Sequence, residues 1–445
     1  MTASRIRLLP GIGIAMLLVA LLAMAGPAAP LAWLGSTEIA TGRGEQGPWQ
    51  QNESRYDYVD DPSVAIDSRG AMAVAWVDQS RKAVLLQRFG PDGAKLFDRP
   101  VDVSRQPRTF SWLPRLAFAP DAPDRLYVLW QEIIFSGGSH GGDILLARSD
   151  DGGRSFAAPL NLSTSKGGDG KGRITRDVWH NGSFDLAAGG GGAVHAAWTE
   201  YDGALWVSRS SDGGRNFSSP RRVADERSAH PARAPSLALA PQGVVYLAWT
   251  VGENPAADIR VARSSDGGIS FGKPQVVAPS RNYSDAPKLA VDRAGVLHLV
   301  YAETAGGPFE RSHIRYTRST DGGRTFEPAR DISTPLPASA VSAAFPSLGV
   351  DMAGNVCALW ELYPQLGQPP RGLALAVLRD GGRSFSKSVV VPDSMDAAGG
   401  FNGSLQGLLM KKLAVGPAGT VAVVNSSVKP GSHSRVWLMR GQWAR

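Results

Sequence analysis

The chain has 445 residues, with 52 glycines, 31 prolines, 43% hydrophobic residues and 20% charged residues. This composition is typical of many short strands joined by tight turns, and it argues against a helical bundle and against an intrinsically disordered chain. The net charge of +7 favours anionic partners, but the basic residues are scattered and no nucleic-acid-binding module is recognisable, so we expect no nucleic acid partner.

The N-terminal segment has the features of an export signal. Arg5 and Arg7 precede an apolar stretch over 8–25, which ends in the small-x-small sequence Ala23-Met24-Ala25. We predict a signal peptide over 1–25 and an extracytoplasmic protein, either periplasmic or secreted. Apolar residues continue to Leu34, so an uncleaved anchor is the alternative, and it would be the chain's only attachment to a membrane.

A repeated eight-residue motif dominates the rest of the chain, 36–445, which we interpret as one domain. The motif reads Ser-x-Asp-Gly-Gly, one variable residue, a small polar residue and Phe, and successive aspartates lie roughly 54 to 61 residues apart. Its aspartates are Asp151, Asp212, Asp266, Asp321 and Asp380, with a decayed sixth copy at Asp92. The Asp can accept hydrogen bonds from its own turn and the glycines permit positive φ, so the motif predicts a tight hairpin turn.

A second repeat precedes each of these turns. It consists of an apolar strand, a glycine-bearing turn, and another strand that ends in an aromatic residue. The aromatic residues are Trp76, Trp130, Trp198, Trp249, Tyr301 and Trp360, and a seventh copy over 412–424 lacks one. We therefore predict an all-β propeller of four-stranded blades, seven blades being favoured and six the alternative, closed by an N-terminal strand over 37–41.

The eight-residue motif resembles the Asp box of the sialidase superfamily, also called BNR-repeat proteins. The resemblance covers the chain from about residue 60 onward and implies a propeller that acts on carbohydrate as a glycoside hydrolase. Sialidases bind the substrate carboxylate through three arginines, and use an Asp as acid and a Tyr, activated by Glu, as nucleophile. The catalytic domain of that family has six blades, and its Arg-Ile-Pro motif is absent here; in Pro114-Arg115-Leu116 the proline lies on the other side.

Propeller geometry places the Asp boxes on one face and the longer loops around the channel mouth on the other. The boxes are therefore expected to be scaffold, and function is expected where the repeat is broken. An acidic residue also follows the second strand's aromatic in five blades, at Asp78, Glu132, Glu200, Glu303 and Glu361. We favour a structural task in each blade for these carboxylates over a general-acid role.

The irregular loops carry arginines among aromatic residues, a combination that suits an anionic sugar. By resemblance to sialidases, we assign Arg115, Arg176 and Arg233 as carboxylate binders, Asp177 or His180 as proton donor, and Tyr283 as nucleophile. The single cysteine, Cys357, and the histidine spacing identify no metal site, and we expect no cofactor.

Two functions remain open from the sequence. The first is an enzyme that cleaves an acidic carbohydrate, in the manner of an exo-sialidase. The second is a non-catalytic propeller that binds a glycan or an envelope protein, or serves as an assembly factor. In either case we expect a monomer.

Overall fold

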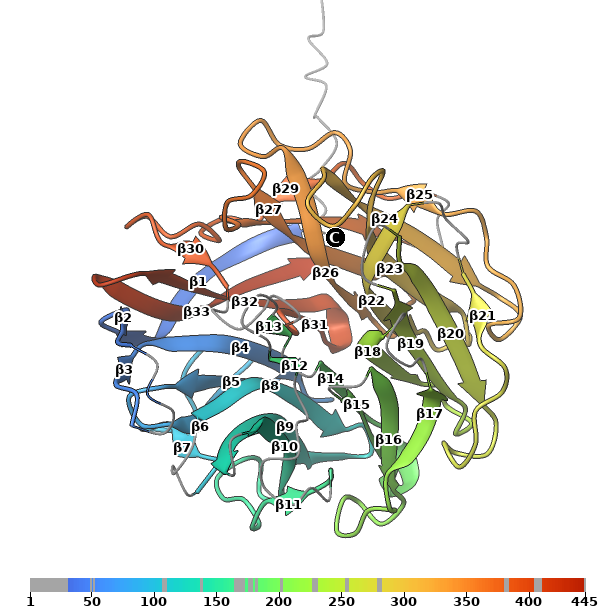
Figure 1. Cartoon of the computed structure of the whole chain (residues 1–445), viewed down its shortest axis with the longest axis horizontal. Coiled ribbons are helices and arrows are strands. Elements are labelled where there is room, and N and C mark those ends of the chain that lie inside the picture. Colours follow the sequence, from blue (N-terminus) through green and yellow to red (C-terminus); the bar gives the residue numbers. More distant parts are fainter. Residues whose placement is uncertain are drawn as a thin grey trace, which may run out of the picture.

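The computed structural model describes residues 31–443, apart from 49, 51–52, 106–109, 137–138, 164–172, 175–178, 181–182, 201–202, 226–230, 253–255, 278–281, 380–383 and 404–409. Seven antiparallel four-stranded blades form a ring, and in blade 7 the short strand β30 (Phe401–Asn402) pairs as a fifth (Figure 1). The prediction of a seven-bladed all-β propeller is thus confirmed. Within the described residues, no helix is long and apolar enough to cross a membrane. The predicted signal peptide lies outside them.

The strands of each blade are ordered from the axis outward as the chain runs, except that the N-terminal strand β1 (Leu31–Gly42) is the outermost strand of blade 7. The innermost strands are β4 (Val59–Ile66), β8 (Phe110–Ala119), β14 (Phe184–Ala188), β18 (Ala232–Leu239), β22 (Tyr283–Val291), β26 (Ser342–Val350) and β31 (Leu413–Val415). The second strands are β5 (Met72–Asp78), β9 (Ala122–Ser136), β15 (Val194–Thr199), β19 (Val245–Val251), β23 (Leu297–Thr304), β27 (Val356–Tyr363) and β32 (Thr420–Lys429).

The outermost strands are short in every blade except blade 7. The third strands are β6 (Ala83–Phe89), β10 (Ser139–Ser149), β16 (Ala204–Ser210), β20 (Asp258–Ser264), β24 (Ser312–Ser319), β28 (Leu373–Leu378) and β33 (His433–Trp443). The outermost strands are β7 (Val101–Asp102), β11 (Leu160–Asn161), β17 (Arg221–Asp225), β21 (Gln275–Val276), β25 (Arg330–Asp331), β29 (Val389–Val390) and β1 (Leu31–Gly42). The remaining elements are the pairs β2 (Glu45–Gln46) with β3 (Tyr56–Asp57) and β12 (Arg173–Ile174) with β13 (Trp179–His180), the strand β30 (Phe401–Asn402), and the 3-10 turns η1 (Gly190–Gly192) and η2 (Pro417–Gly419).

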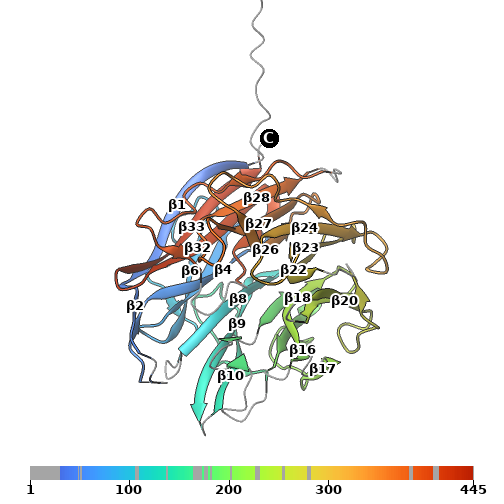
Figure 2. The same ribbon diagram turned by 45° about the horizontal axis from the view of Figure 1, so that its top comes forward.

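The N-terminal strand closes the ring as predicted. β1 pairs with β33 from Leu31 opposite Trp443 to Gly42 opposite Ser434, so it begins before the expected residue 37. The Ser434 hydroxyl also accepts a hydrogen bond from the Val59 N–H at 2.9 Å, which ties blade 7 to blade 1. The N-terminal strand β1 therefore lies along β33 as the outermost strand of blade 7 (Figure 2).

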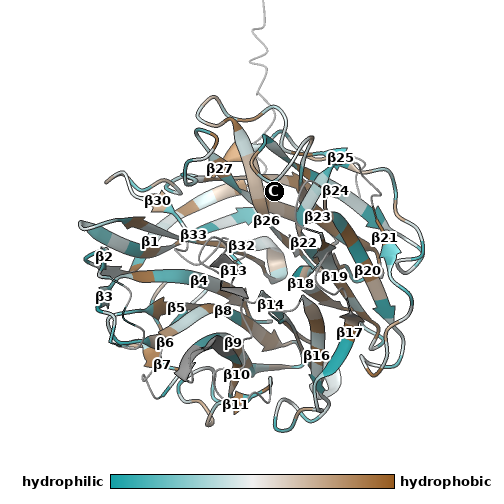
Figure 3. Cartoon of the chain, in the orientation of Figure 1, coloured by the Kyte–Doolittle hydropathy of each residue, from teal (hydrophilic) through white to brown (hydrophobic). Residues whose placement is uncertain are grey.

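The hydrophobic core lies between neighbouring blades. Apolar side chains of facing sheets form seven clusters, and the aromatic residues that end the second strands are at most 1% exposed. Figure 3 shows hydrophobic stretches along the inner strands and hydrophilic colour on outer strands such as β17 and β25. The burial of apolar surface between neighbouring blades therefore supplies the main driving force for folding into the ring.

The Asp boxes form local hydrogen-bonded turns. In the box of blade 5, the Ser319 hydroxyl donates to Asp321 Oδ1 at 2.8 Å and accepts from the Gly323 N–H at 2.9 Å. The N–H and the hydroxyl of Thr325 both donate to the Asp321 carboxylate. These bonds hold the pKa of Asp321 well below its ordinary value, the Thr325 hydroxyl contributing most. The boxes at Asp151, Asp212 and Asp266 repeat this pattern, and the box at Asp380 lies outside the described residues.

The boxes lie on the same face as the turns between first and second strands. The Gly152 N–H donates to Asp124 O at 2.8 Å, and the Gly213 N–H donates to Gly192 O at 2.9 Å. The opposite face therefore holds the starts of the first strands and the ends of the second strands. We call it the upper face.

A β-bulge recurs in five of the innermost strands. In each, a residue with positive φ precedes a proline and shifts the pairing register. The residues with positive φ are Asp61, Leu113, Ala234, Ala286 and Phe345, with φ between 50° and 54°. Because non-glycine residues seldom adopt this conformation, the bulge is a specified feature that re-aims the residues on either side of it.

Candidate functional site

The structure brings two of the sequence-predicted residues together on the upper face, at the junction of blades 4 and 5. Arg233 Nη2 donates a hydrogen bond to the Tyr283 hydroxyl at 2.7 Å, and the guanidinium lies 5.3 Å from the Tyr283 ring centre. The Tyr283 hydroxyl in turn donates to Asp285 Oδ2 at 3.3 Å. We call these three residues the junction triad.

A second set of donors orients the Asp285 carboxylate. Its Oδ1 atom accepts hydrogen bonds from the Thr250 hydroxyl at 2.9 Å and the Ala286 N–H at 2.7 Å, and Arg233 Nε lies 3.3 Å away. The carboxylate is therefore held with one oxygen on fixed donors and the other beside the tyrosine. The Arg233 and Asp285 side chains are 16% and 23% exposed, so the triad is sheltered but reachable from solvent.

Backbone pairing across the blades positions the triad. Arg233 lies opposite Thr250 in the β18–β19 pair, and Tyr283 begins β22 where Ala257 of blade 4 forms a bridge to it. Arg233 Nη1 also donates to the carbonyl of Gly252. Gly252 has a φ of +99°, and a Cβ there would lie 2.7 Å from Ala256 O, so only glycine fits this loop.

The triad can transfer a proton. A carboxylate beside a phenol accepts the phenolic proton, and a guanidinium bonded to the same oxygen stabilises the phenolate that remains. The resulting group is a nucleophile or base with its own positive counter-charge. Asp285 and Thr250 were not among the predicted site residues, although Asp285 lies two positions after Tyr283 and so on the same side of the strand.

The remaining predicted residues are distributed differently. Arg176 and Asp177 lie outside the described residues, and for His180 the structure describes only its backbone in β13. The β12–β13 ribbon is drawn over the centre of the ring in Figure 1. The assignments of Arg176, Asp177 and His180 therefore stay predictions.

Arg115 lies in an innermost strand and is only 1% exposed. Its Nη1 donates to the carbonyls of Leu113 and Pro114, and its guanidinium lies 5.2 Å from the Phe184 ring centre. Burial lowers its pKa, while Asp185 and Asp61 partly offset that effect. No contact among the described residues joins Arg115 to the junction triad, and its role as a carboxylate binder stays a prediction.

The recurrent carboxylates differ from Asp285 in their surroundings. Glu361 is 1% exposed and accepts hydrogen bonds from Lys412 Nζ at 2.5 Å and Asn402 Nδ2 at 2.7 Å. Glu303 pairs with Arg315 at 3.3 Å within its own blade, and Asp78 accepts from the turn that follows it. These bonds hold strands and turns in place, which favours the structural interpretation.

The residues suited to metal or thiol chemistry are engaged or buried. Within the described part of the chain, no group of three or more His, Cys, Asp or Glu residues could hold a metal ion. His195 and His298 are buried in strands, and are bonded to Gly267 O at 3.0 Å and to the Tyr316 hydroxyl at 2.8 Å respectively. Burial raises the pKa of the fully buried Cys357 thiol, so that thiol is inert.

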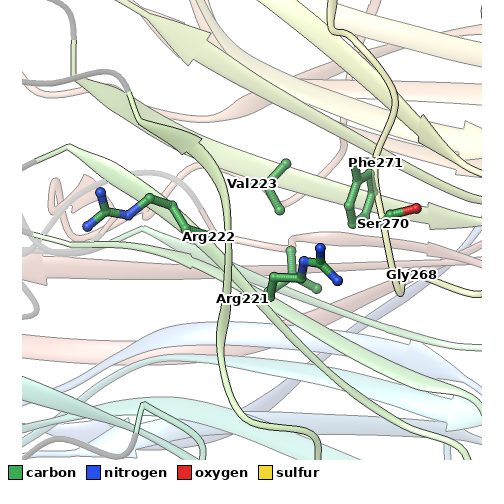
Figure 4. Close-up of a pocket in the computed structure, with 7 residues that line it drawn as sticks. Arg221, Arg222, Val223, Gly268, Ser270 and Phe271 are labelled. Atoms are coloured by element: carbon green, nitrogen blue, oxygen red, sulfur yellow. The ribbon is translucent and has the colours of Figure 1, made fainter.

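A cavity of about 130 Å³ lies between blades 3 and 4 on the Asp-box side (Figure 4). Arg221, Arg222 and the Asp-box residues Gly268, Ser270 and Phe271 line it. Arg221 Nη1 is bonded to Ile269 O at 2.6 Å, and Arg222 lies over the Trp206 ring. The residues that line the cavity do not bring an acid, a base and a nucleophile together, so we interpret the cavity as a packing gap beside a structural turn.

No protein-family model and no curated protein matches the sequence, but solved structures share its fold. An ulvan lyase of a new polysaccharide lyase family, bound to -[GlcA(1-4)Rha3S]-, is 11% identical over 88% of this chain and 95% of its own, with a TM-score of 0.53. An alpha-L-arabinanase of Penicillium chrysogenum, complexed with arabinobiose, is 14% identical over 73% of this chain and 92% of its own (TM-score 0.48). A Hadza microbial sialidase is 15% identical over 68% of this chain and 63% of its own (TM-score 0.43). The chain thus shares its β-propeller fold with the ulvan lyase.

Proposed function

We propose that the protein is an exported, sialidase-like Asp-box propeller that cleaves acidic glycans, with the junction triad as the centre of its chemistry. The single observation that carries this proposal is the pair of hydrogen bonds at the Tyr283 hydroxyl, one from Arg233 and one to Asp285. An isolated buried tyrosine would be a packing residue. A tyrosine held between a guanidinium and a carboxylate is poised to lose its proton.

In this mechanism Asp285 accepts the Tyr283 proton as the phenolic oxygen attacks the anomeric carbon. Arg233 balances the charge of the phenolate before attack, and a proton donor, assigned to Asp177 or His180, protonates the departing oxygen. Water then attacks the anomeric carbon and releases the sugar from Tyr283. The proton of the water goes to the deprotonated donor, and Asp285 returns its proton to the Tyr283 oxygen. The acidic group of the glycan would meet the cationic residues that line the same face.

The alternative is a non-catalytic propeller that binds a glycan or an envelope protein. Two observations favour it: seven blades instead of six, and the absent Arg-Ile-Pro motif. In that case the triad would be an interblade clamp, with Arg233 and Asp285 binding a ligand without turnover.

The experiment is a turnover assay of the exported protein on sialosides and uronic-acid polymers. It should record both reducing-end release and the ultraviolet absorbance of an unsaturated uronate, which separates hydrolysis from elimination. We expect turnover by the wild type and a loss of at least ~100-fold in Tyr283→Phe, because the nucleophile is removed. Tyr363→Phe is the matched control, since Tyr363 ends β27 on the same face and its hydroxyl makes no hydrogen bond among the described residues.

Two results would count against the proposal. Absence of turnover on every acidic glycan, with retained glycan binding, would favour the non-catalytic alternative. Equal activity of Tyr283→Phe and Tyr363→Phe would remove Tyr283 from the chemistry.

A further inference from the structure

One exposed aromatic side chain lies on the upper face, in the same blade as the central residue of the junction triad. Phe309 is 85% exposed, and it is the only exposed aromatic residue among those whose side chains the structure describes. It belongs to the loop over 305–311, which joins β23 to β24 at the upper end of blade 5. Tyr283 begins the innermost strand of that blade. The exposed ring and the proposed nucleophile therefore share one blade and one face.

The strand register of blade 5 places this loop beside Tyr283. Tyr283 pairs with Thr304 at the end of β23, and Thr304 pairs with Ser312 at the start of β24. Adjacent strands lie about 4.8 Å apart, and Phe309 is three residues from Ser312, which is at most about 11 Å along the chain. The Phe309 Cα atom thus lies within roughly 20 Å of the Tyr283 Cα atom, with Thr304 between the two.

Hydrogen bonds hold the loop in one shape. The Glu310 N–H donates to Gly307 O at 3.2 Å, which closes a β-turn. Pro308 and Phe309 are the two central residues of this turn, and the proline ring restricts φ at the first of them. The Thr304 hydroxyl donates to Gly307 O at 2.7 Å and ties the turn to the end of β23. Phe309 is therefore presented at the tip of a fixed turn, which lowers the entropic cost of binding a ligand there.

The corresponding loops of other blades differ from this one. The loop spans only 79–82 in blade 1 and 430–432 in blade 7, and neither contains a large apolar residue. Among the described residues of these loops, blade 6 alone also has an exposed large apolar side chain, that of Leu366, which is 47% exposed. An aromatic tip beside Tyr283 is thus a departure from the repeat, and such departures are the candidates for function in a repeat protein.

An exposed aromatic ring can bind one face of a sugar. The faces of the ring carry partial negative charge, and a pyranose presents C–H groups that are apolar and slightly positive. Arg311 is also exposed beside the turn and offers a cation to an acidic substituent. Because Thr304 lies between the turn and Tyr283, a glycan held at the triad would reach Phe309 with a neighbouring sugar and not with the ring under attack.

We propose that Phe309 is a stacking platform for a neighbouring sugar of the glycan, so that the protein takes its acidic carbohydrate as a chain and not as a single terminal sugar. The position of the first sugar, at Tyr283, rests on the proposed function. A glycan is favoured over a partner protein as the occupant because the ring adjoins the triad. One exposed aromatic residue also supplies too little apolar surface for a stable protein interface.

The test is isothermal titration calorimetry of the full mature chain with the methyl glycoside and the hexasaccharide of galacturonic acid, and with the same two forms of sialic acid. Binding is measured in Tyr283→Phe, which lacks the proposed nucleophile and leaves the ligand intact. We expect the hexasaccharide of at least one series to bind roughly tenfold more tightly than its methyl glycoside, as a stacking contact would contribute. Adding Phe309→Ala should remove this gain and leave the affinity for the methyl glycoside unchanged.

Two further variants separate stacking from a structural effect. Phe309→Trp should keep the gain, because an aromatic face is retained. Leu366→Ala is the matched control, since Leu366 is an exposed apolar loop residue of another blade, and it should also keep the gain. Because the Phe309 side chain is exposed, none of the Phe309 variants should change Tm.

The outcomes distinguish the platform from the proposed function. Hexasaccharide affinity unaffected by Phe309→Ala would overturn the platform, while turnover of acidic polymers by the wild type would still support the proposed function. A gain that Phe309→Ala removes, with no turnover by the wild type, would support the platform and count against the catalytic proposal. Equal losses in Phe309→Ala and Leu366→Ala would overturn stacking and favour a wider apolar surface of the kind that docks a protein. No binding of any of these sugars would overturn both proposals.

Discussion

The Asp-box turns and the junction of blades 4 and 5 use the same residue types for opposite purposes. In each of the four described boxes, the Asp carboxylate is hydrogen-bonded to residues of its own turn, and the same set of bonds recurs. At the junction, Arg233, Tyr283 and Asp285 are joined across two blades, in an arrangement that occurs once among the described residues. In a repeat protein, a feature shared by all blades stabilises the blade, and a feature found in one blade is the candidate for function.

The largest effects are expected when two carboxylates of the upper face, Glu361 and Asp285, are replaced by amides. Glu361→Gln leaves Lys412 as a buried unpaired charge, so we expect the free energy of unfolding to fall by about 3–5 kcal/mol. Asp285→Asn should change it by less than about 1 kcal/mol, since Asp285 is partly exposed, but should lower turnover by ~100-fold because the proton acceptor is lost. Denaturant unfolding and turnover per folded molecule measure the two quantities.

The two variants should lose different properties: Glu361→Gln should lose stability, and Asp285→Asn should lose turnover. A Glu361→Gln protein that is stable but inactive, or an Asp285→Asn protein that is active but unstable, would exchange the assigned roles of the two carboxylates.

A smaller effect tests the scaffold role of the boxes. Ser319→Ala removes the hydroxyl that joins Asp321 to the Gly323 N–H, and Ser319 is only 1% exposed. We expect a loss of about 1–2 kcal/mol in the free energy of unfolding and no change in turnover per folded molecule. Ser432→Ala, at an exposed turn of blade 7, is the control and should stay within about 0.5 kcal/mol of the wild type.

The pH dependence of the boxes follows from the depressed pKa values of Asp212, Asp266 and Asp321. A carboxyl group whose pKa is lower in the folded chain than in the unfolded chain stabilises the fold above the unfolded value of about 3.9, and loses this contribution as pH falls below it. We therefore expect Asp321→Asn to lower Tm at pH 6, and the difference from wild type to shrink below about pH 4. A difference that is constant with pH would show that the carboxylate charge is not what the turn uses.

The smallest expected effect concerns Lys288 at alkaline pH. The folded chain should release the Lys288 proton near pH 8, whereas the unfolded chain holds it to about pH 10.4. The unfolded state therefore binds more protons in this window, and the stability of the wild type should rise with pH relative to Lys288→Gln. Parallel Tm curves for the two proteins between pH 8 and 10 would contradict the lowered pKa.

The fold was predictable because the sequence features that specify a blade recur along the chain. The glycine pairs, the alternating strands and the terminal aromatic residues each recur in most blades, so seven blades and the N-terminal closure follow from counting. The start of the closing strand was less predictable, because Leu31, Trp33 and Leu34 are equally compatible with an apolar leader.

The candidate site was only partly predictable. Arg233 and Tyr283 could be proposed as cationic and aromatic loop residues, but their contact depends on the packing of blade 4 against blade 5, which sequence spacing does not encode. Lys288 carried a signal that the sequence analysis missed: it follows a proline at the position where three other blades have serine. A substitution that breaks a repeat is visible only when the repeat is aligned on the inner strands rather than on the Asp boxes.

The most direct measurement is hydrogen–deuterium exchange of the full mature chain with and without a saturating acidic oligosaccharide. The proposed site predicts protection in the peptides that carry the start of β22 around Tyr283 and the start of β18 around Arg233, with unchanged exchange in the Asp-box turns. This result is expected whether the ligand is cleaved or only bound. Protection centred on the Asp-box turns at 264–271 or 319–326, with none near Tyr283, would contradict the assignment of function to the upper face.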